Sequence, residues 1–291
     1  MNDDLDRLRG DEGRTTVEEP VGSDRPDNRL AWIGLIALVV VIGGALWWWA
    51  PSPTQSPAES VGRVPLEEVA PPQSPTTSRL GVGEPDANLP ALGELDAYVR
   101  PLLAALSARP ELAALLTSDG LVRRFVVSVE AIGRGASPAR QVAAIAPRGS
   151  FEVQQRGDEF VISPASFARY DGLVRLVEDL DPDQLARLYG RLQPRLDDAW
   201  AELGVPGTFD EGITRAIQHL LQTPIPPADA RVEQAKGTNY AYRDPQFEGL
   251  SSAQRQLLRL GPQNARRVQE RLRAFGIALG IAAGEMMKSE V

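Results

Sequence analysis

Acidic side chains gather at two places in the sequence and are the first candidates for chemistry. The two groups are Glu178, Asp179, Asp181 and Asp183, then Asp197 and Asp198. Two carboxylates on either side of a glycosidic bond can act as the acid and the base that cleave a glycan. The first group straddles an expected helix start at Pro182, where the helix dipole favours negative charge. Helix capping and solvation are the favoured interpretation, and a carboxylate-dependent envelope enzyme acting on wall glycan is the alternative.

A second set of polar residues suggests binding rather than catalysis. It consists of Arg123, Arg124, Arg169, Tyr170 and Asp171. Guanidinium groups hold carboxylates or other anionic ligands with pairs of N–H donors. The simpler interpretation is an internal ion pair of these arginines with Asp171 or Asp244. Both interpretations are kept, and the set is the candidate binding site.

Other reactive groups are missing from the sequence. There is no cysteine, which excludes disulfides, thiolate zinc sites and iron–sulfur clusters. The single histidine, His219, lies among apolar residues of an expected helix and is interpreted as structural. No nucleophile-elbow, P-loop, HExxH or dinucleotide-binding glycine pattern occurs. We therefore expect no catalytic residue, no metal and no cofactor, and we do not expect an enzyme.

The most distinct stretch of the sequence is RLAWIGLIALVVVIGGALWWWAPSP, residues 29–53. From Leu30 to Ala50 it carries no charge, and about 20 helical residues cover the hydrocarbon core of a bilayer. Amphipathic rings stand near both ends, where lipid headgroups lie: Trp32, Trp47, Trp48 and Trp49. The apolar core is too long, and its end too bulky, for a cleavable signal peptide. The sequence predicts one uncleaved transmembrane helix over residues 30–50 that anchors the chain in a lipid bilayer.

The residues that flank this span predict its orientation. Arg25 and Arg29 precede it, whereas the first basic residue after it is Arg63. Positive residues favour the cytoplasmic side, so we expect the N-terminus in the cytoplasm and the C-terminal part exported. This topology corresponds to a single-pass protein of a bacterial inner membrane, with its C-terminal domain in the periplasm.

The chain divides into four segments. Residues 1–29 are polar and charged and are expected to be a disordered cytoplasmic tail. Residues 51–88, after the transmembrane helix, repeat proline with serine and are expected to be a disordered, extended linker. Residues 89–291 form the exported domain.

The exported domain has the pattern of a mostly α fold. Apolar residues recur at helical spacing within residues 93–116, 118–135, 163–180, 181–204, 208–224 and 251–275. Capping boxes are expected where Asp181 precedes Gln184 and where Thr208 precedes Glu211. Two stretches, 149–164 and 230–244, alternate around polar turns and predict short β-hairpins. Isolated hairpins are marginally stable, so these should pack on the helices or pair with each other.

The C-terminal helix carries two patterns. Val268, Leu272, Phe275 and Leu279 form an apolar stripe. Gly276, Gly280 and Gly284 recur at four-residue spacing, which is typical of close packing. Because this apolar run is too short to span a bilayer, we expect tight packing on the domain or self-association.

Several motifs resemble a single protein family. They are LVRRFVVSVE, FARYDGLVRLVEDLD, LYGRLQPRLDDAWAELG and YAYRDPQFEGLSSAQRQLLRLGPQNARRVQERL, in this order within residues 89–275. The chain resembles a domain-of-unknown-function family of single-pass, membrane-anchored envelope proteins of Gram-negative bacteria. The resemblance implies an inner-membrane anchor, a proline-rich spacer and an exported domain, and it brings no catalytic residue and no named partner.

These patterns together favour a binding role in the cell envelope. The formal net charge of -8 argues against a nucleic-acid partner, which a basic surface would attract. A tethered domain without a catalytic pattern is typical of an adaptor or scaffold that acts close to the membrane. The expected partner is an envelope protein or a wall component.

Overall fold

The computed structural model describes residues 79–235 and 240–287. The expected cytoplasmic tail, the expected transmembrane helix at 30–50 and the linker up to residue 78 lie outside these ranges. Within the described ranges, no helix combines the length and the apolar character required to cross a membrane.

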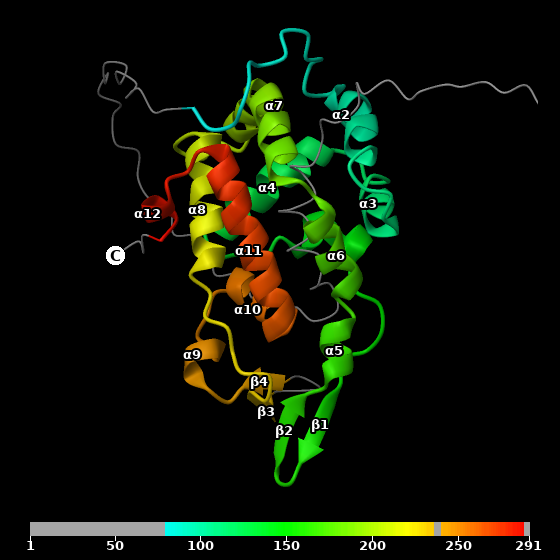
Figure 1. Cartoon of the computed structure of the whole chain (residues 1–291), viewed down its shortest axis with the longest axis vertical. Coiled ribbons are helices and arrows are strands. Elements are labelled where there is room, and N and C mark those ends of the chain that lie inside the picture. The colour runs from blue at the N-terminus through cyan, green and yellow to red at the C-terminus, as the bar shows by residue number, and fades with distance from the viewer. Residues whose placement is uncertain (1–78, 236–239, 288–291) are drawn as a thin grey trace, which may run out of the picture. The chain divides into compact units, whose positions relative to one another are not determined.

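Helices form most of the described domain (Figure 1). They are α2 Leu95–Ala104, α3 Pro110–Leu115, α4 Leu121–Gly133, η1 Ala139–Ile145, α5 Pro164–Ala168, α6 Asp171–Asp179, α7 Pro182–Glu202, α8 Phe209–Leu221, α9 Pro245–Glu248, α10 Ser252–Leu258, α11 Pro262–Leu279 and α12 Ala283–Met286, of which η1 is a 3-10 helix. The mostly α prediction is confirmed for this part of the chain.

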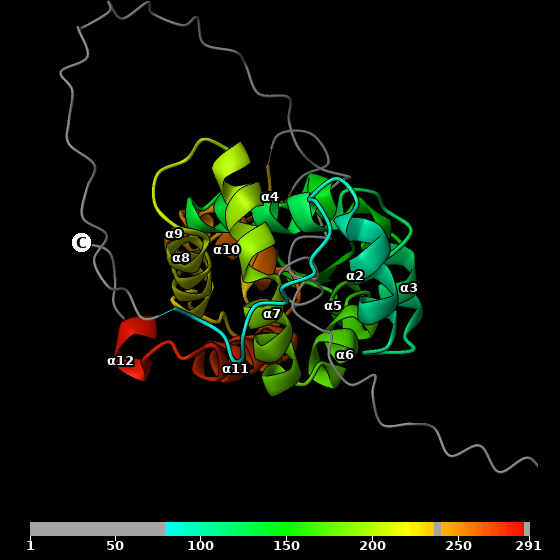
Figure 2. The same cartoon turned by 90° about the horizontal axis from the view of Figure 1, so that it is seen from above.

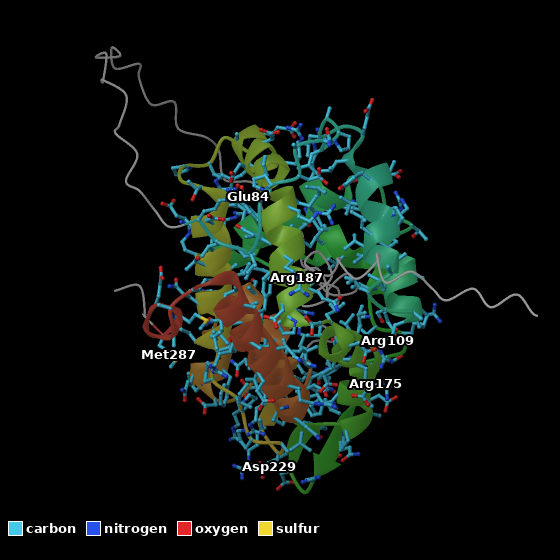
Figure 3. The ribbon with its side chains drawn as sticks, turned by 45° about the horizontal axis from the view of Figure 1, so that its top comes forward. Glu84, Arg109, Arg175, Arg187, Asp229 and Met287 are labelled. Atoms are coloured by element: carbon cyan, nitrogen blue, oxygen red, sulfur yellow. The ribbon has the colours of Figure 1, made fainter. Side chains whose placement is uncertain are left out.

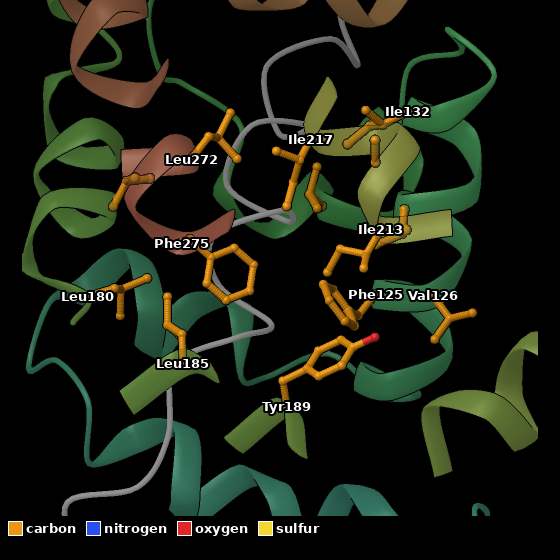
Figure 4. Close-up of a cluster of buried hydrophobic side chains, with 14 of the residues drawn as sticks. Phe125, Val126, Ile132, Leu180, Leu185, Tyr189, Ile213, Ile217, Leu272 and Phe275 are labelled. Atoms are coloured by element: carbon orange, nitrogen blue, oxygen red, sulfur yellow. The ribbon is translucent and has the colours of Figure 1, made fainter. Parts of the chain in front are cut away.

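Four helices pack around one hydrophobic core. Helix α4 contacts α7 and α8, and α11 contacts the same two helices, as the view from above shows (Figure 2). Phe125, Tyr189, Ile213 and Phe275 meet at the centre of this core and are fully buried (Figure 4). The predicted apolar stripe of α11 is buried along its whole length, because it faces these neighbours.

The ring of Phe209 links the elements of the core. Its centroid lies 5.6 Å from that of Phe125, 5.9 Å from that of Tyr189 and 5.8 Å from that of Trp200. The Phe125 and Trp200 rings meet it edge to face, which is a favoured arrangement of aromatic pairs. One side chain at the start of α8 therefore joins α4 and α7.

Local signals set most helix ends. Thr208 and Glu211 form the predicted capping box at the start of α8. Asp181 caps α7 by accepting from the Gln184 N–H at 2.8 Å. Gly261 and Pro262 separate α10 from α11, as predicted.

The stretch 163–180 was expected as one helix, and the structure divides it into α5 and α6. The break falls at Arg169 and Tyr170. The Tyr170 N–H donates to Phe167 O at 3.0 Å, three residues back, which tightens the chain into a turn. This turn buries the Tyr170 ring, whose exposed fraction is 2%.

The two predicted hairpins are present and pair with each other. Strands β1 Val153–Arg156, β2 Glu159–Ile162, β3 Arg231–Gln234 and β4 Tyr240–Tyr242 form one antiparallel sheet in that order. The central contact aligns Phe160 with Val232. Figure 1 shows the sheet at one end of the helical body, beside α5 and α9.

The segment 79–88, assigned to the linker from the sequence, packs on the domain. Its backbone lies against the core helices. The Gly81 N–H donates to Leu279 O at 2.9 Å, and the Val82 N–H donates to Ala186 O at 3.2 Å. The Leu80 side chain packs against the hydrophobic core as well, so these residues are part of the described domain.

The C-terminal glycines have different roles. Gly276 packs against Met286 so closely that a Cβ atom there would clash with its sulfur. Gly280 ends α11 in the left-handed conformation, with φ of 94°. Gly284 has no heavy atom within 4 Å of its Cβ position. Tight packing is confirmed for Gly276 alone, and self-association stays a prediction.

Candidate functional site

The predicted binding set is split between two places in the fold. Arg123 and Arg124 lie in the first turn of α4, whereas Arg169, Tyr170 and Asp171 lie at the junction of α5 and α6. The set therefore does not form one site, and its two halves are described separately.

The arginines of α4 make structural contacts. Arg123 donates from Nε and Nη2 to the two carboxylate oxygens of Glu202, at 2.7 and 3.0 Å. This hydrogen bond raises the pKa of Arg123 and lowers the pKa of Glu202. Arg124 donates from Nε to Asp119 O at 2.7 Å and from Nη1 to Gln141 O at 3.5 Å. Arg124 thus braces η1 against α4.

The expected partners of these arginines are engaged elsewhere. Asp171 accepts from Asn264 Nδ2 at 2.9 Å, and Asp244 caps α9 through the Gln246 N–H at 2.9 Å. The expected ion pair with Asp171 or Asp244 was therefore wrong for Arg123, because the end of α7 brings Glu202 to it instead.

Arg169 and Tyr170 line a groove of about 400 Å³, whereas Asp171 is not among the residues that line it. The groove lies between α3, the segment that follows η1, and the junction of α5 and α6. Three guanidinium side chains line it, from Arg148, Arg169 and Arg175, and we call it the arginine groove. Its apolar walls are Pro110, Ala114, Ile145, Pro147 and Leu173. Figure 3 shows Arg175 on α6, on the same side of the molecule as Arg109 of the α3 start.

Arg169 is the best positioned of the three cations. Its Nε donates to Ser166 O at 3.1 Å and its Nη1 donates to Gly149 O at 3.0 Å. Its guanidinium carbon lies 5.6 Å from the ring centroid of Tyr170 and 6.0 Å from that of Phe151. Carbonyls and rings orient this group without neutralising its charge.

Arg148 and Arg175 are exposed at the groove. The ion pairs among the described residues use other arginines, so all three groove cations lack a carboxylate counter-ion within 4 Å in that part of the chain. The groove therefore presents net positive charge to solvent from three separate segments.

Tyr170 and Glu111 form the deeper part of the groove. Burial raises the pKa of the Tyr170 hydroxyl, and the nearby Arg169 charge opposes this effect. Glu111, from the first turn of α3, lies so close to Gly172 that a Cβ atom there would clash with its Oε1. Its Oε2 is buried and accepts no hydrogen bond from the described residues. A buried acceptor without a donor is uncommon in folded proteins.

Ion pairs fix the helices that frame the groove. Arg109, at the start of α3, pairs with Asp179 at the end of α6. Glu178 accepts from Arg267 Nε at 2.8 Å, which joins α6 to α11. These contacts hold α3 and α6 at the spacing that leaves the groove between them.

Five of the six acidic residues singled out in the sequence have structural partners, and the sixth, Asp183, is exposed in the first turn of α7. Glu178, Asp179 and Asp181 are used in the ion pairs and the cap described above. Asp198 accepts from Arg195 Nη1 at 2.7 Å, and Asp197 accepts from Gln193 Nε2 at 2.6 Å. Within residues 79–235 and 240–287 no group of three acidic, cysteine or histidine side chains is placed to hold a metal ion.

His219 also has a structural setting, as interpreted from the sequence. It is half-buried on α8, and its Nε2 lies 2.6 Å from Ser251 Oγ at the start of α10. The contact ties these two helices together.

A second cavity of about 360 Å³ lies where the chain enters the domain. It is lined by Val82, Gly83, Glu84, Arg187 and Arg191. At this edge Asp86 accepts from the Tyr98 hydroxyl at 2.6 Å and from Arg191 Nη2 at 3.1 Å. These hydrogen bonds lower the pKa of Asp86. Arg191 is already paired with Asp86, so this contact fixes the chain entry.

Sequence reasoning found Arg169 and Tyr170 but missed Arg148, Arg175 and Glu111. These three residues belong to different segments of the chain and carry no shared spacing. Only the packing of α3 on both η1 and α6 brings them to one groove.

The fold and the groove define a mostly helical domain with a small antiparallel sheet and a cationic surface groove. A family model described as protein of unknown function (DUF3014) matches residues 121–276, more than half of the chain. The chain belongs to this family. No curated protein and no solved structure matches it.

Proposed function

We propose that the chain is a membrane-anchored adaptor or scaffold of the bacterial cell envelope. In this proposal one transmembrane helix at residues 30–50 holds it in the inner membrane, with the N-terminus in the cytoplasm. The domain stands in the periplasm and binds an envelope protein or a wall component through the arginine groove. The observation that supports this most directly is the set of three guanidinium groups that line one groove without carboxylate partners in the described chain.

The charges of the groove favour an anionic partner. Like charges on neighbouring side chains repel one another, and an incoming anion relieves that repulsion. Arg169 is already oriented by two carbonyls, so little side-chain entropy is lost when it binds. Arg148 and Arg175 are exposed and can reach a partner without any opening of the core.

The same groups favour binding over catalysis. A guanidinium is protonated at every physiological pH and cannot act as a general base. Among the described residues, Glu111 is the single carboxylate that lines the groove, whereas glycan cleavage generally uses two. The groove is thus better suited to hold a partner than to transfer protons.

Affinity capture from envelope extracts tests this role. The full chain, solubilised in detergent, is compared with the Arg148→Gln/Arg175→Gln variant and with the matched control Arg266→Gln. Arg266 is exposed on α11 and outside the groove. We expect a partner that is retained by the unaltered chain and the control and lost from the groove variant. An identical retained set in all three samples would contradict the proposal.

The topology has a separate test. A reporter that is active only in the periplasm is fused after Val291. We expect it to be active, and an inactive reporter on a stably expressed fusion would reverse the proposed orientation.

A further inference from the structure

We infer that the arginine groove binds a zwitterionic ligand of the amino-acid or short-peptide class. In this arrangement a ligand carboxylate meets the guanidinium groups, and a ligand ammonium meets Glu111. The inference rests on the proposed function, because it names the ligand class of the same groove.

The cationic side of the groove requires an anion on the ligand. Arg148, Arg169 and Arg175 come from three segments and line one space. A guanidinium binds a carboxylate with two parallel N–H donors, which gives both strength and orientation. Arg169 uses its Nε–H and one N–H of Nη1 for carbonyls, so the two N–H groups of Nη2 and the second N–H of Nη1 are left for a ligand.

The acidic side of the groove requires a donor. Glu111 Oε2 is buried and accepts no hydrogen bond from the described chain. The carboxylate lies against Gly172, in the first turn of α6. A buried acceptor without a donor costs free energy, and a ligand ammonium would supply that donor.

The two sides together distinguish the ligand class. A simple anion such as phosphate would satisfy the arginines, but it would be repelled by Glu111 and would leave Oε2 without a donor. A ligand with carboxylate and ammonium groups a few atoms apart satisfies both. The amino-acid backbone has this arrangement at its termini.

The walls and the volume limit the size of the ligand. About 400 Å³ lies near the lower end of the range for small-molecule sites. Ala114, Ala144 and Ala146 give small apolar contacts. The groove is therefore suited to one or two residues with small side chains rather than to a long or aromatic peptide.

Calorimetric titration of the full chain in detergent tests this inference. The first probe is the dipeptide alanylalanine, which has one ammonium, one carboxylate and two small side chains. The second is its N-acetyl derivative, which lacks the ammonium, and the third is inorganic phosphate. We expect the free dipeptide to bind at least about tenfold more tightly than either of the others. A hydrogen bond between charged groups contributes about that much to binding. This comparison uses the unaltered chain and does not depend on how any variant folds.

Variants then assign the two sides. Arg175→Gln should weaken the dipeptide about tenfold or more, whereas the control Arg266→Gln should leave it unchanged. Glu111→Gln should weaken the free dipeptide and have little effect on the N-acetyl derivative, because the two changes remove the same interaction. Thermal unfolding of each variant is the check on folding.

Several outcomes would overturn the inference. Phosphate that binds as tightly as the dipeptide would make the groove a simple anion site, and so would a Glu111→Gln variant that leaves the dipeptide affinity unchanged. Absence of binding by all three probes would also overturn it. If capture of a partner still depends on the groove in that case, the ligand class is wrong and the adaptor role stands.

The dipeptide unit can belong to a protein or to a wall peptide. Co-sedimentation of the full chain with purified wall sacculi, lost in the Arg148→Gln/Arg175→Gln variant, would indicate the wall. Dipeptide binding without co-sedimentation would indicate that the ligand is the chain terminus of a protein partner.

Discussion

The main-chain N–H of Leu80 donates to Asp210 Oδ2 at 3.1 Å, across 130 positions of the sequence. The Tyr189 hydroxyl donates to the other oxygen of the same carboxylate. The Val82 N–H, two residues on, donates to Ala186 O at 3.2 Å. The entry of the chain into the domain is therefore held on α7 and α8 by directed hydrogen bonds.

Gly190→Ala should weaken the attachment of residues 80–82 to α7. A Cβ atom at position 190 would lie 2.6 Å from Val82 O, too close for any side chain. Alanine ordinarily stabilises a helix interior by about 1 kcal/mol relative to glycine, but a backbone clash of this kind costs about 1–3 kcal/mol. We expect a net loss of stability in urea unfolding and faster amide exchange at Leu80 and Val82.

Gly133→Ala is the matched control. It makes the same change in α4, where the nearest atoms to the added Cβ lie at 3.6 Å, an ordinary contact. We expect unchanged or slightly higher stability and unchanged exchange at Leu80. Equal losses in the two variants would show that the close contact at Gly190 does not matter.

Asp197 makes the stability of the domain depend on pH. Burial and the nearby charge of Asp210 raise its pKa from 3.8 to about 6. Between these two values the folded state holds a proton that the unfolded state has released, so stability falls as pH rises from about 4 to about 6. Above about pH 6 the ionised side chain lowers the free energy of unfolding by an amount that no longer changes with pH.

Asp197→Asn should remove both the destabilisation by the ionised side chain and the dependence of stability on pH. We expect the variant to be more stable than the unaltered chain at pH 7.5, by about 1 kcal/mol once solvent screening of a half-buried group is allowed for. Urea unfolding at pH 4.5, 6 and 7.5 measures the effect. The control Asp198→Asn, at an exposed ion pair with Arg195, should change little. A pH slope that persists in Asp197→Asn would assign it to another group.

The fold was predictable where the determining signal is local. The stripe of α11, the capping box at Thr208 and the break at Gly261 and Pro262 each lie within a few residues of the element they set. The instability of isolated hairpins left two arrangements open, packing on the helices or pairing with each other, and the structure shows the pairing. The joint at Arg169 and Tyr170 was missed, because burial of the Tyr170 ring ends α5 and no glycine or proline marks it.

The groove was only partly predictable, because its charges come from separate segments. Arg169 was found as a member of the candidate binding set, because a guanidinium can hold an anionic ligand. Glu111 and Arg175 are 64 positions apart and share no pattern, and the packing of α3 on α6 alone brings them together. Arg123 was grouped with Arg169 in the candidate set, and the fold pairs it with Glu202 instead.

Phe209→Leu tests the aromatic centre of the core. The variant loses volume and three ring contacts at a fully buried position. We expect a loss of about 1–3 kcal/mol in unfolding free energy, together with a weaker near-ultraviolet circular dichroism signal from Trp200. Phe151→Leu, at a ring that is 43% exposed, should cost less than about 0.5 kcal/mol. Similar losses at the two positions would mean that Phe209 does not organise the core.

Ser251 and His219 should be energetically coupled. The Ser251 hydroxyl caps α10 by accepting from the Gln254 N–H at 3.2 Å, and it also lies 2.6 Å from His219 Nε2. Ser251→Ala therefore removes a cap and a side-chain contact, and we expect a loss of about 1–2 kcal/mol. Thr208→Ala removes a capping box of the same kind without a histidine contact and should cost about 1 kcal/mol.

A double-mutant cycle isolates the histidine contact from the cap. In a His219→Ala background, Ser251→Ala should cost about 0.5–1 kcal/mol less than in the unaltered chain, because the contact is already gone. The cost of Thr208→Ala should be the same in both backgrounds, since its capping box does not involve His219. Urea unfolding of the six chains supplies all of these differences. If Ser251→Ala costs the same with and without His219, the contact between α8 and α10 contributes nothing and the serine acts as a cap alone.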